Sequence, residues 1–185
     1  MMRWSLRLAA ATLKQGGVIA YPTEAVYGLG CHPLNEAAVN RLLQLKQRDP
    51  GKGLILISDS LKHLEPYLQP LSQSERDKIT KKRAKPTTWI VPAKNWVPNW
   101  LTGHHASLAI RITDHPIAAQ LCRLVGMPIV STSANLSAHR PAKTNIQVRL
   151  QFDGQLDGII SGKIDTSASP SEIRDLKTDK ILRPS

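Results

Sequence analysis

The stretch SLAIRITDHPIAAQLCRLVGMPIVSTSAN, residues 107–135, decides the fold class. Its first apolar run and its last, which ends near Ser131, are short enough to be buried β-strands. Between them Asp114 can cap a helix, with Pro116 in the first turn and Gly126 at the end. A strand, a helix and a strand in succession predict an α/β sheet with helices packed on it.

The same alternation continues along the rest of the chain. Apolar residues at helical spacing predict helices over residues 3–15, 35–45, 60–68, 72–82 and 145–152. Short apolar runs predict strands at residues 18–21, 54–57, 88–91, 158–160 and 181–183. Neither a repeat nor a linker interrupts this pattern, so we expect a single α/β domain over residues 1–185.

The charge balance favours an anionic partner. The chain has 25 Lys and Arg residues against 14 Asp and Glu residues, a formal net charge of +11. Such a surplus suits nucleotides or RNA, and anionic lipid less well, although a basic surface that only maintains solubility would look the same.

Cysteine usage and hydropathy indicate a cytoplasmic protein. Cys31 and Cys122 belong to no CxxC pair, which argues against a disulfide framework and against a zinc site. No run of 18 apolar residues is present, so we expect no membrane span. Adjacent His104 and His105 suit a solvated loop better than a metal site, and we expect no metal held by the protein.

The common catalytic and nucleotide-binding signatures are missing. The sequence has no GxxxxGK[ST] loop, no GxGxxG, no HExxH and no GxSxG. Gly28 and Gly30 give only a two-glycine turn. A nucleotide site would therefore have to be built from other residues.

Three constellations remain as candidates, and the first is the cationic loop LKQRDPGKG, residues 45–53. Arg48 supplies a planar fork that can bind phosphate oxygens bidentately, and Lys46 a flexible point charge. The helix dipole alone could explain Lys46, but Arg48 and Lys52 lie beyond the helix end. The segment RDPGKG is also a candidate lid over the site.

The second constellation is PIVSTSANLS, residues 128–137, where a buried strand runs into small polar side chains. Loops at the carboxyl ends of strands in α/β sheets are common ligand sites. If the backbone stays extended, Ser131, Ser133 and Asn135 face the same side. A polar turn with local hydrogen bonds is the alternative.

The third constellation combines Thr23 and Glu24, which follow a buried strand, with a strand that places Ser107 and Arg111 on one face. A buried arginine is costly unless it is paired. Arg111 therefore needs an anionic ligand or an internal acid, and Asp114 is the rival partner.

The basic run KKRAK, residues 81–85, is a separate signal. It suits a solvated helix end, or a patch that contacts RNA phosphates. Since aromatic residues make up only 4% of the chain, RNA recognition would rely on shape and phosphate contacts more than on base stacking.

Five ordered motifs resemble those of the YrdC-like threonylcarbamoyl-AMP synthases. They are YPTEAVYGLG at 21–30, LKQR at 45–48, SLAIRITDHP at 107–116, STSAN at 131–135 and PSEIRD at 170–175. The resemblance runs over essentially the whole chain and is closest to the short, single-domain bacterial form.

The resemblance implies a twisted, mixed β-sheet flanked by helices, with a concave basic cleft. It also implies a nucleotidyltransferase that makes L-threonylcarbamoyl-adenylate and pyrophosphate from L-threonine, bicarbonate and ATP, with Mg2+ carried on the phosphates. Downstream tRNA threonylcarbamoyl-transfer proteins would then install N6-threonylcarbamoyladenosine (t6A37) in ANN-decoding tRNAs.

The resemblance assigns two groups of site residues. The nucleotide would contact Lys46, Arg48, Ser133, Asn135 and Arg183, the first two being the catalytic pair. L-threonine would be surrounded by Thr23, Ser107, Arg111, Ser131 and Ser171. The chain departs from its relatives at RAKPTTW, which replaces a W-P-G-P-like turn, and at Ile57, where longer relatives have a histidine. Both departures concern the wall of the threonine pocket.

Two other functions compete with this one. A double-stranded-RNA or ribosome-maturation binding protein could use the same basic cleft. A related enzyme could transfer the carbamoyl group to a different acceptor, as in hydrogenase-maturation proteins that contain a similar domain.

Overall fold

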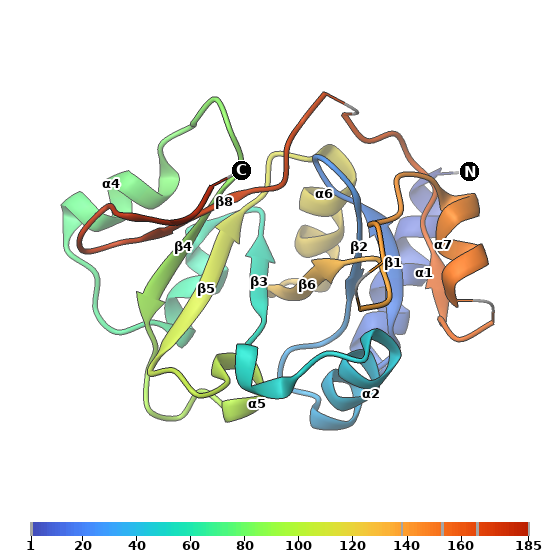
Figure 1. Cartoon of the computed structure of the whole chain (residues 1–185), viewed down its shortest axis with the longest axis horizontal. Coiled ribbons are helices and arrows are strands. Elements are labelled where there is room, and N and C mark those ends of the chain that lie inside the picture. The colour runs from blue at the N-terminus through green and yellow to red at the C-terminus, as the bar shows by residue number, and fades with distance from the viewer. Residues whose placement is uncertain (1, 138, 153, 166, 185) are drawn as a thin grey trace.

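The structure, a computed structural model, describes residues 2–137, 139–152, 154–165 and 167–184, and the side chains of residues 5 onward within these ranges. Its described strands form one mixed sheet in the order β7-β1-β2-β6-β3-β5-β4-β8-β9 (Figure 1). Their bounds are β1 Ile19–Pro22, β2 Tyr27–Gly30, β3 Ile55–Ser58, β4 Thr87–Pro92, β5 Ser107–Ile112, β6 Ile129–Ser133, β7 Gly158–Ile159, β8 Glu172–Asp175 and β9 Ile181–Arg183.

The helices flank this sheet, which confirms the mixed α/β class. Their bounds are α1 Met2–Lys14, α2 Glu36–Lys46, α3 Leu61–Leu64, α4 Gln73–Thr80, α5 Asn99–Thr102, α6 Pro116–Val125 and α7 Asn145–Phe152, with single turns η1 Pro50–Lys52 and η2 Glu65–Tyr67. Strands β3 and β5 run parallel, whereas β3 and β6 run antiparallel.

Alternating strand residues enter two separate cores, one on each face of the sheet. On β3, Ile57 packs into the cluster that includes Leu6 and Leu121 of α1 and α6, while Leu56 packs into the cluster that includes Leu42 of α2. This alternation follows from the pleat, in which successive side chains point to opposite faces. The helices α1 and α6 cover only part of their face, which leaves Ile55 of β3 partly exposed.

Several element boundaries differ from the sequence expectations for local reasons. The cap of α6 is His115, whose ring accepts from the backbone of Ala118, while Asp114 is exposed and lies 4.0 Å from Lys82. The expected helix over 60–68 is divided into α3 and η2. Asn35 caps α2 as expected, by accepting from the backbone of Ala38.

The two-glycine turn expected at residues 28–30 is instead strand β2, paired with both β1 and β6. A Cβ on Gly30 would lie 2.6 Å from the carbonyl oxygen of Val130 and 2.8 Å from the ring of Tyr21. Glycine is therefore required by the close approach of a strand and a tyrosine, rather than by a turn.

The central strand β3 should carry a large share of the stability. Leu56 is fully buried between β6 and β5, whereas Leu150 on α7 is 79% exposed. We expect Leu56→Ala to lower the free energy of unfolding by about 2–5 kcal/mol, because it leaves a cavity in the core. The matched change Leu150→Ala should stay within about 0.5 kcal/mol of the unmodified chain. Urea unfolding measures both, and equal losses would contradict this arrangement of the core.

Candidate active site

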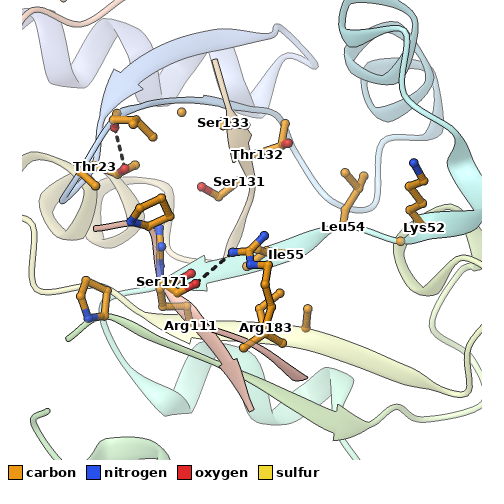
Figure 2. Close-up of a pocket in the computed structure, with 18 of the residues that line it drawn as sticks. Thr23, Lys52, Leu54, Ile55, Arg111, Ser131, Thr132, Ser133, Ser171 and Arg183 are labelled. Carbon is orange, nitrogen blue, oxygen red and sulfur yellow. Dashed lines mark hydrogen bonds between the residues drawn. The ribbon is translucent and has the colours of Figure 1, made fainter. Parts of the chain in front are cut away.

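A cavity of about 410 Å³ occupies the part of the α1 and α6 face that the two helices leave uncovered. Strand register explains its floor, because directly paired residues point to the same side of a sheet. Ser131 pairs with Ile55, Ile55 with Ala109, and Ala109 with Ile90, so four neighbouring strands contribute one row of lining residues. Figure 2 shows Arg111, Ser131, Ser171 and Arg183 gathered in this region.

Among the described residues, four cationic side chains line the cavity, those of Arg48, Lys52, Arg111 and Arg183. Burial and the positive charge of Arg183 lower the pKa of Arg48, and burial and the charge of Arg111 lower the pKa of Arg183. These guanidinium groups therefore lie close enough to repel one another, which favours an anionic ligand.

The arginine side chains are held by few internal partners. Arg48 donates to the carbonyl oxygen of Gly53 at 3.0 Å, while its Nε is buried without a partner. Arg183 donates to the carbonyl oxygen of Ser171 at 2.9 Å, as Figure 2 shows. Arg111 makes no hydrogen bond to any other residue in the described part of the chain, and its Nε is also buried and unpaired. Most of their donors remain available to a ligand.

Serine and threonine side chains line the same cavity. Ser131 and Ser133 point into it from β6, which stays extended through residue 133 as the alternation requires. Thr23, Ser107 and Ser171 also line it. Residues far apart in the sequence thus supply hydroxyls that can bind oxygen-rich groups without adding charge.

Lys46 lies next to the cavity but does not line it, and 5% of its surface is exposed. Its ammonium group donates to the carbonyl oxygen of Ser133 at 2.5 Å, to that of Asn135 at 2.7 Å and to Asn135 Oδ1 at 3.2 Å. Asn135 Oδ1 also accepts from the hydroxyl of Ser133 at 2.6 Å. Burial and the charge of Arg48 lower the pKa of Lys46 to about 8. The group is therefore mainly protonated at neutral pH and connects the cationic loop to the hydroxyl-rich loop.

The structure brings the ten site residues named from the sequence into one region. All of them line the cavity except Lys46 and Asn135, which are hydrogen-bonded to each other next to it. Their roles toward ligands stay predictions. The departure at RAKPTTW keeps its contact with this region, because Pro86 lines the cavity and Thr88 shares a 2.9 Å hydrogen bond with Ser171.

Two further charged residues line the cavity but are not among the ten predicted site residues, namely Lys52 and Glu24. Lys52 could have been predicted as a ligand-binding residue, because it is a cation on the loop beyond the helix end. Glu24 is the internal partner of Arg111, with 3.5 Å between Arg111 Nη2 and Glu24 Oε2, so Asp114 was the wrong candidate. The two residues are far apart in sequence, and only the fold reveals the pair.

The segment RDPGKG forms a fixed part of the cavity wall, which does not support the lid expectation. The backbone of His104 donates to the carbonyl of Gly51 at 3.1 Å, and that of Leu54 donates to the carbonyl of Leu101 at 2.8 Å. Gly103, with φ of 65°, packs so closely that a Cβ there would run into the carbonyl of Gly51. Such packing leaves little room for hinged movement.

Metal-binding side chains do not gather in the described part of the chain, where no group of three or more His, Cys, Asp or Glu residues could hold an ion. In the same part of the chain, no helix is long and apolar enough to cross a membrane.

Residues 11–185 match the Sua5/YciO/YrdC family, whose description is telomere recombination. The chain belongs to this family. A threonylcarbamoyl-AMP synthase of Cellvibrio japonicus is 49% identical over 189 residues, covering 100% of both chains. One from Nitrosococcus oceani is also 49% identical, over 97% of each chain.

A solved member of the family shares the fold closely. The structure of P. abyssi Sua5 complexed with L-threonine superposes with a TM-score of 0.89 at 32% identity, over 98% of this chain. This chain spans 54% of that longer protein.

The buried contact of Lys46 should be measurable as stability. We expect Lys46→Met to lower the free energy of unfolding by about 1–3 kcal/mol, because it leaves buried carbonyl oxygens without their donor. Lys52→Met makes the same change at an exposed lining position and should alter stability by less than about 0.5 kcal/mol. Urea midpoints of the two variants provide the comparison. If they coincide, Lys46 does not hold the two loops together.

Proposed function

We propose that this chain is an L-threonylcarbamoyladenylate synthase. It joins L-threonine, bicarbonate and ATP into threonylcarbamoyl-adenylate and releases pyrophosphate and water. The observation that carries the proposal is one cavity lined both by the cationic residues Arg48, Lys52, Arg111 and Arg183 and by serine and threonine side chains. Full-length relatives named threonylcarbamoyl-AMP synthase, at 49% identity, support the same reaction and indicate that the chain is an enzyme.

The cationic residues that line the cavity suit the triphosphate of ATP. Arg48, Lys52 and Arg183 would neutralise the phosphates and the departing pyrophosphate, and one cation about 4 Å from a phosphate charge contributes roughly 4 kcal/mol at an effective dielectric near 20. Ser133 adds a hydroxyl oxygen that can accept a hydrogen bond, since its proton is donated to Asn135 Oδ1. Lys46 and Asn135 act from behind, by fixing the backbone that presents Ser133.

The part of the cavity around Arg111 suits L-threonine. Arg111 has unused donors for a carboxylate, and a fork geometry that binds carboxylates bidentately. The hydroxyls of Thr23, Ser107, Ser131 and Ser171 surround the remaining space.

The chemistry requires positioning more than proton transfer. Once the amine of threonine has reacted with CO2, the carbamate oxygen is an anionic nucleophile. In-line attack on the α-phosphate then depends on alignment and on neutralising the developing charge, as in other phosphoryl transfers. Mg2+ would be carried mainly by the phosphates, because Glu24 is the only carboxylate among the described residues that line the cavity.

The product is a reactive mixed anhydride, which suits transfer to downstream proteins that modify tRNA. We place this reaction in the cytoplasm with its tRNA substrates, and we regard residues 1–185 as one functional domain. The sheet supports this view, because the strands that line the cavity belong to one continuous hydrogen-bonded order.

Pyrophosphate release tests the proposal. Release should require both L-threonine and bicarbonate. Arg48→Ala should reduce turnover by at least about a hundredfold, the effect of losing one charge-stabilising group, and Lys46→Ala should do the same by releasing the backbone that presents Ser133. Arg149→Ala, at an exposed position of α7, serves as the matched control and should retain full activity. Release without threonine, or unmodified rates in both site variants, would refute the assignment.

A second surface supports direct RNA contact as an accompanying proposal. Lys81, Lys82, Arg83 and Lys85 line a second cavity of about 380 Å³, which shares Glu24 and Pro86 with the first. Arg83 lies over the ring of Trp89, at 4.8 Å from its centroid. These cations can follow a phosphate backbone close to the proposed active site.

Salt dependence of RNA binding tests this contact. We expect Lys82→Gln to lower the slope of log affinity for tRNA against log salt by about 1, because one phosphate contact is lost. Lys14→Gln, at the exposed end of α1, should leave the slope unchanged. Equal slopes for both variants would exclude the basic run as an RNA contact. Tight RNA binding without any pyrophosphate release would instead favour an RNA-binding protein.

A further inference from the structure

Glu24 is the only acidic side chain among the described residues that line the main cavity. It faces a surplus of positive charge from Arg48, Lys52, Arg111 and Arg183. This imbalance suits the phosphates of a nucleotide, but it opposes any ligand that brings a cation. An α-amino acid brings one, because its amino group is protonated at neutral pH.

The contacts of Glu24 hold its carboxylate in place while leaving one oxygen unused. Thr113 donates its hydroxyl to Oε1 at 2.7 Å, and the backbone of Asp165 donates to the carbonyl of Glu24 at 2.8 Å. The other oxygen, Oε2, lies 3.5 Å from Arg111 Nη2 and has no hydrogen-bond partner among the described residues. A buried polar atom without a partner is costly, so a ligand that supplied a donor would be favoured.

The carboxylate is ionised at neutral pH. Burial, the largest influence, would raise the pKa of Glu24, but the charge of Arg111 and the hydrogen bond from Thr113 together lower it below its ordinary value. The side chain keeps 17% of its surface exposed and lines the cavity, while the unpartnered oxygen Oε2 lies just beneath that surface.

Glu24 and Arg111 together present two opposite charges, each with unused hydrogen-bonding capacity. We propose that Glu24 receives the α-ammonium group of the amino acid substrate, while Arg111 receives its carboxylate. This proposal rests on the proposed threonine site and assigns its charge recognition. A zwitterion matches the pair, whereas an anion of the same shape meets repulsion from Glu24.

The same pair gives the reaction a direction. The ammonium group first loses a proton to water, and the neutral amine then attacks CO2 formed from bicarbonate. The new N–C bond and the loss of a second proton to water leave an anionic carbamate, so the attraction to Glu24 becomes repulsion. The carbamate is then driven away from Glu24 and toward Arg48 and Arg183, where the α-phosphate would lie.

Calorimetric binding to the full chain tests the assignment with two ligands. L-threonine carries both charges, while 3-hydroxybutanoate keeps the carboxylate and the hydroxyl but lacks the amine. We expect the unmodified chain to bind threonine at least about tenfold more tightly, the effect of one charge-assisted contact. Equal binding, or a preference for 3-hydroxybutanoate, would overturn the proposal.

The variant Glu24→Gln separates charge recognition from support of Arg111. It should weaken threonine binding by about tenfold to a hundredfold and leave 3-hydroxybutanoate binding unchanged or tighter. Equal weakening of both ligands would show that Glu24 only positions Arg111, and would overturn the proposal. Thr113→Val, which removes a hydrogen bond but keeps the carboxylate, is the matched control and should lose less threonine affinity than Glu24→Gln. If the unmodified chain binds no threonine, the proposed function fails, and this inference fails with it.

Discussion

The ammonium group of Lys46 is shared among three oxygen atoms of Ser133 and Asn135, and the site depends on this contact. It joins the end of α2, where the cationic loop begins, to the end of β6, where the hydroxyl groups are presented. The contact is buried, so its hydrogen bonds are stronger than they would be in water. A lysine at the end of a helix usually indicates a solvated charge, but here the charge is used to fix two loops relative to each other.

Positive charges crowd the cavity. Arg183 lies close enough to Arg48 and to Arg111 for repulsion, and the buried Nε atoms of Arg48 and Arg111 have no hydrogen-bond partner among the described residues. Binding sites commonly sacrifice stability in this way, because the ligand supplies the missing interactions. The two well-packed cores on either face of the sheet provide the stability that tolerates this arrangement.

Local patterns predicted most of the fold, because helix caps and apolar periodicity act over a few residues. The Asn35 cap and the helix over 145–152 are examples. Strand β2 was not predicted, because its glycines resemble a turn. Glycine is needed at position 30 because the backbone of Val130, which is distant in sequence, approaches it closely. For the site, the motifs predicted which residues gather, whereas the partner of Arg111 and the orientation of Lys46 depend on contacts between distant segments. Such contacts leave no periodic signal in a single sequence.

The position of Arg183 adds a thermodynamic consequence. It lies on β9, the edge strand of the sheet, which is exposed and pairs only with β8 across an irregular register. Edge strands fray more readily than central ones. Under the proposed function, a molecule in which β9 has frayed would lack one phosphate-binding group, and only the fraction with β9 docked would bind nucleotide tightly. The apparent affinity would then include the free energy of docking this strand, and nucleotide binding would in turn stabilise the sheet edge.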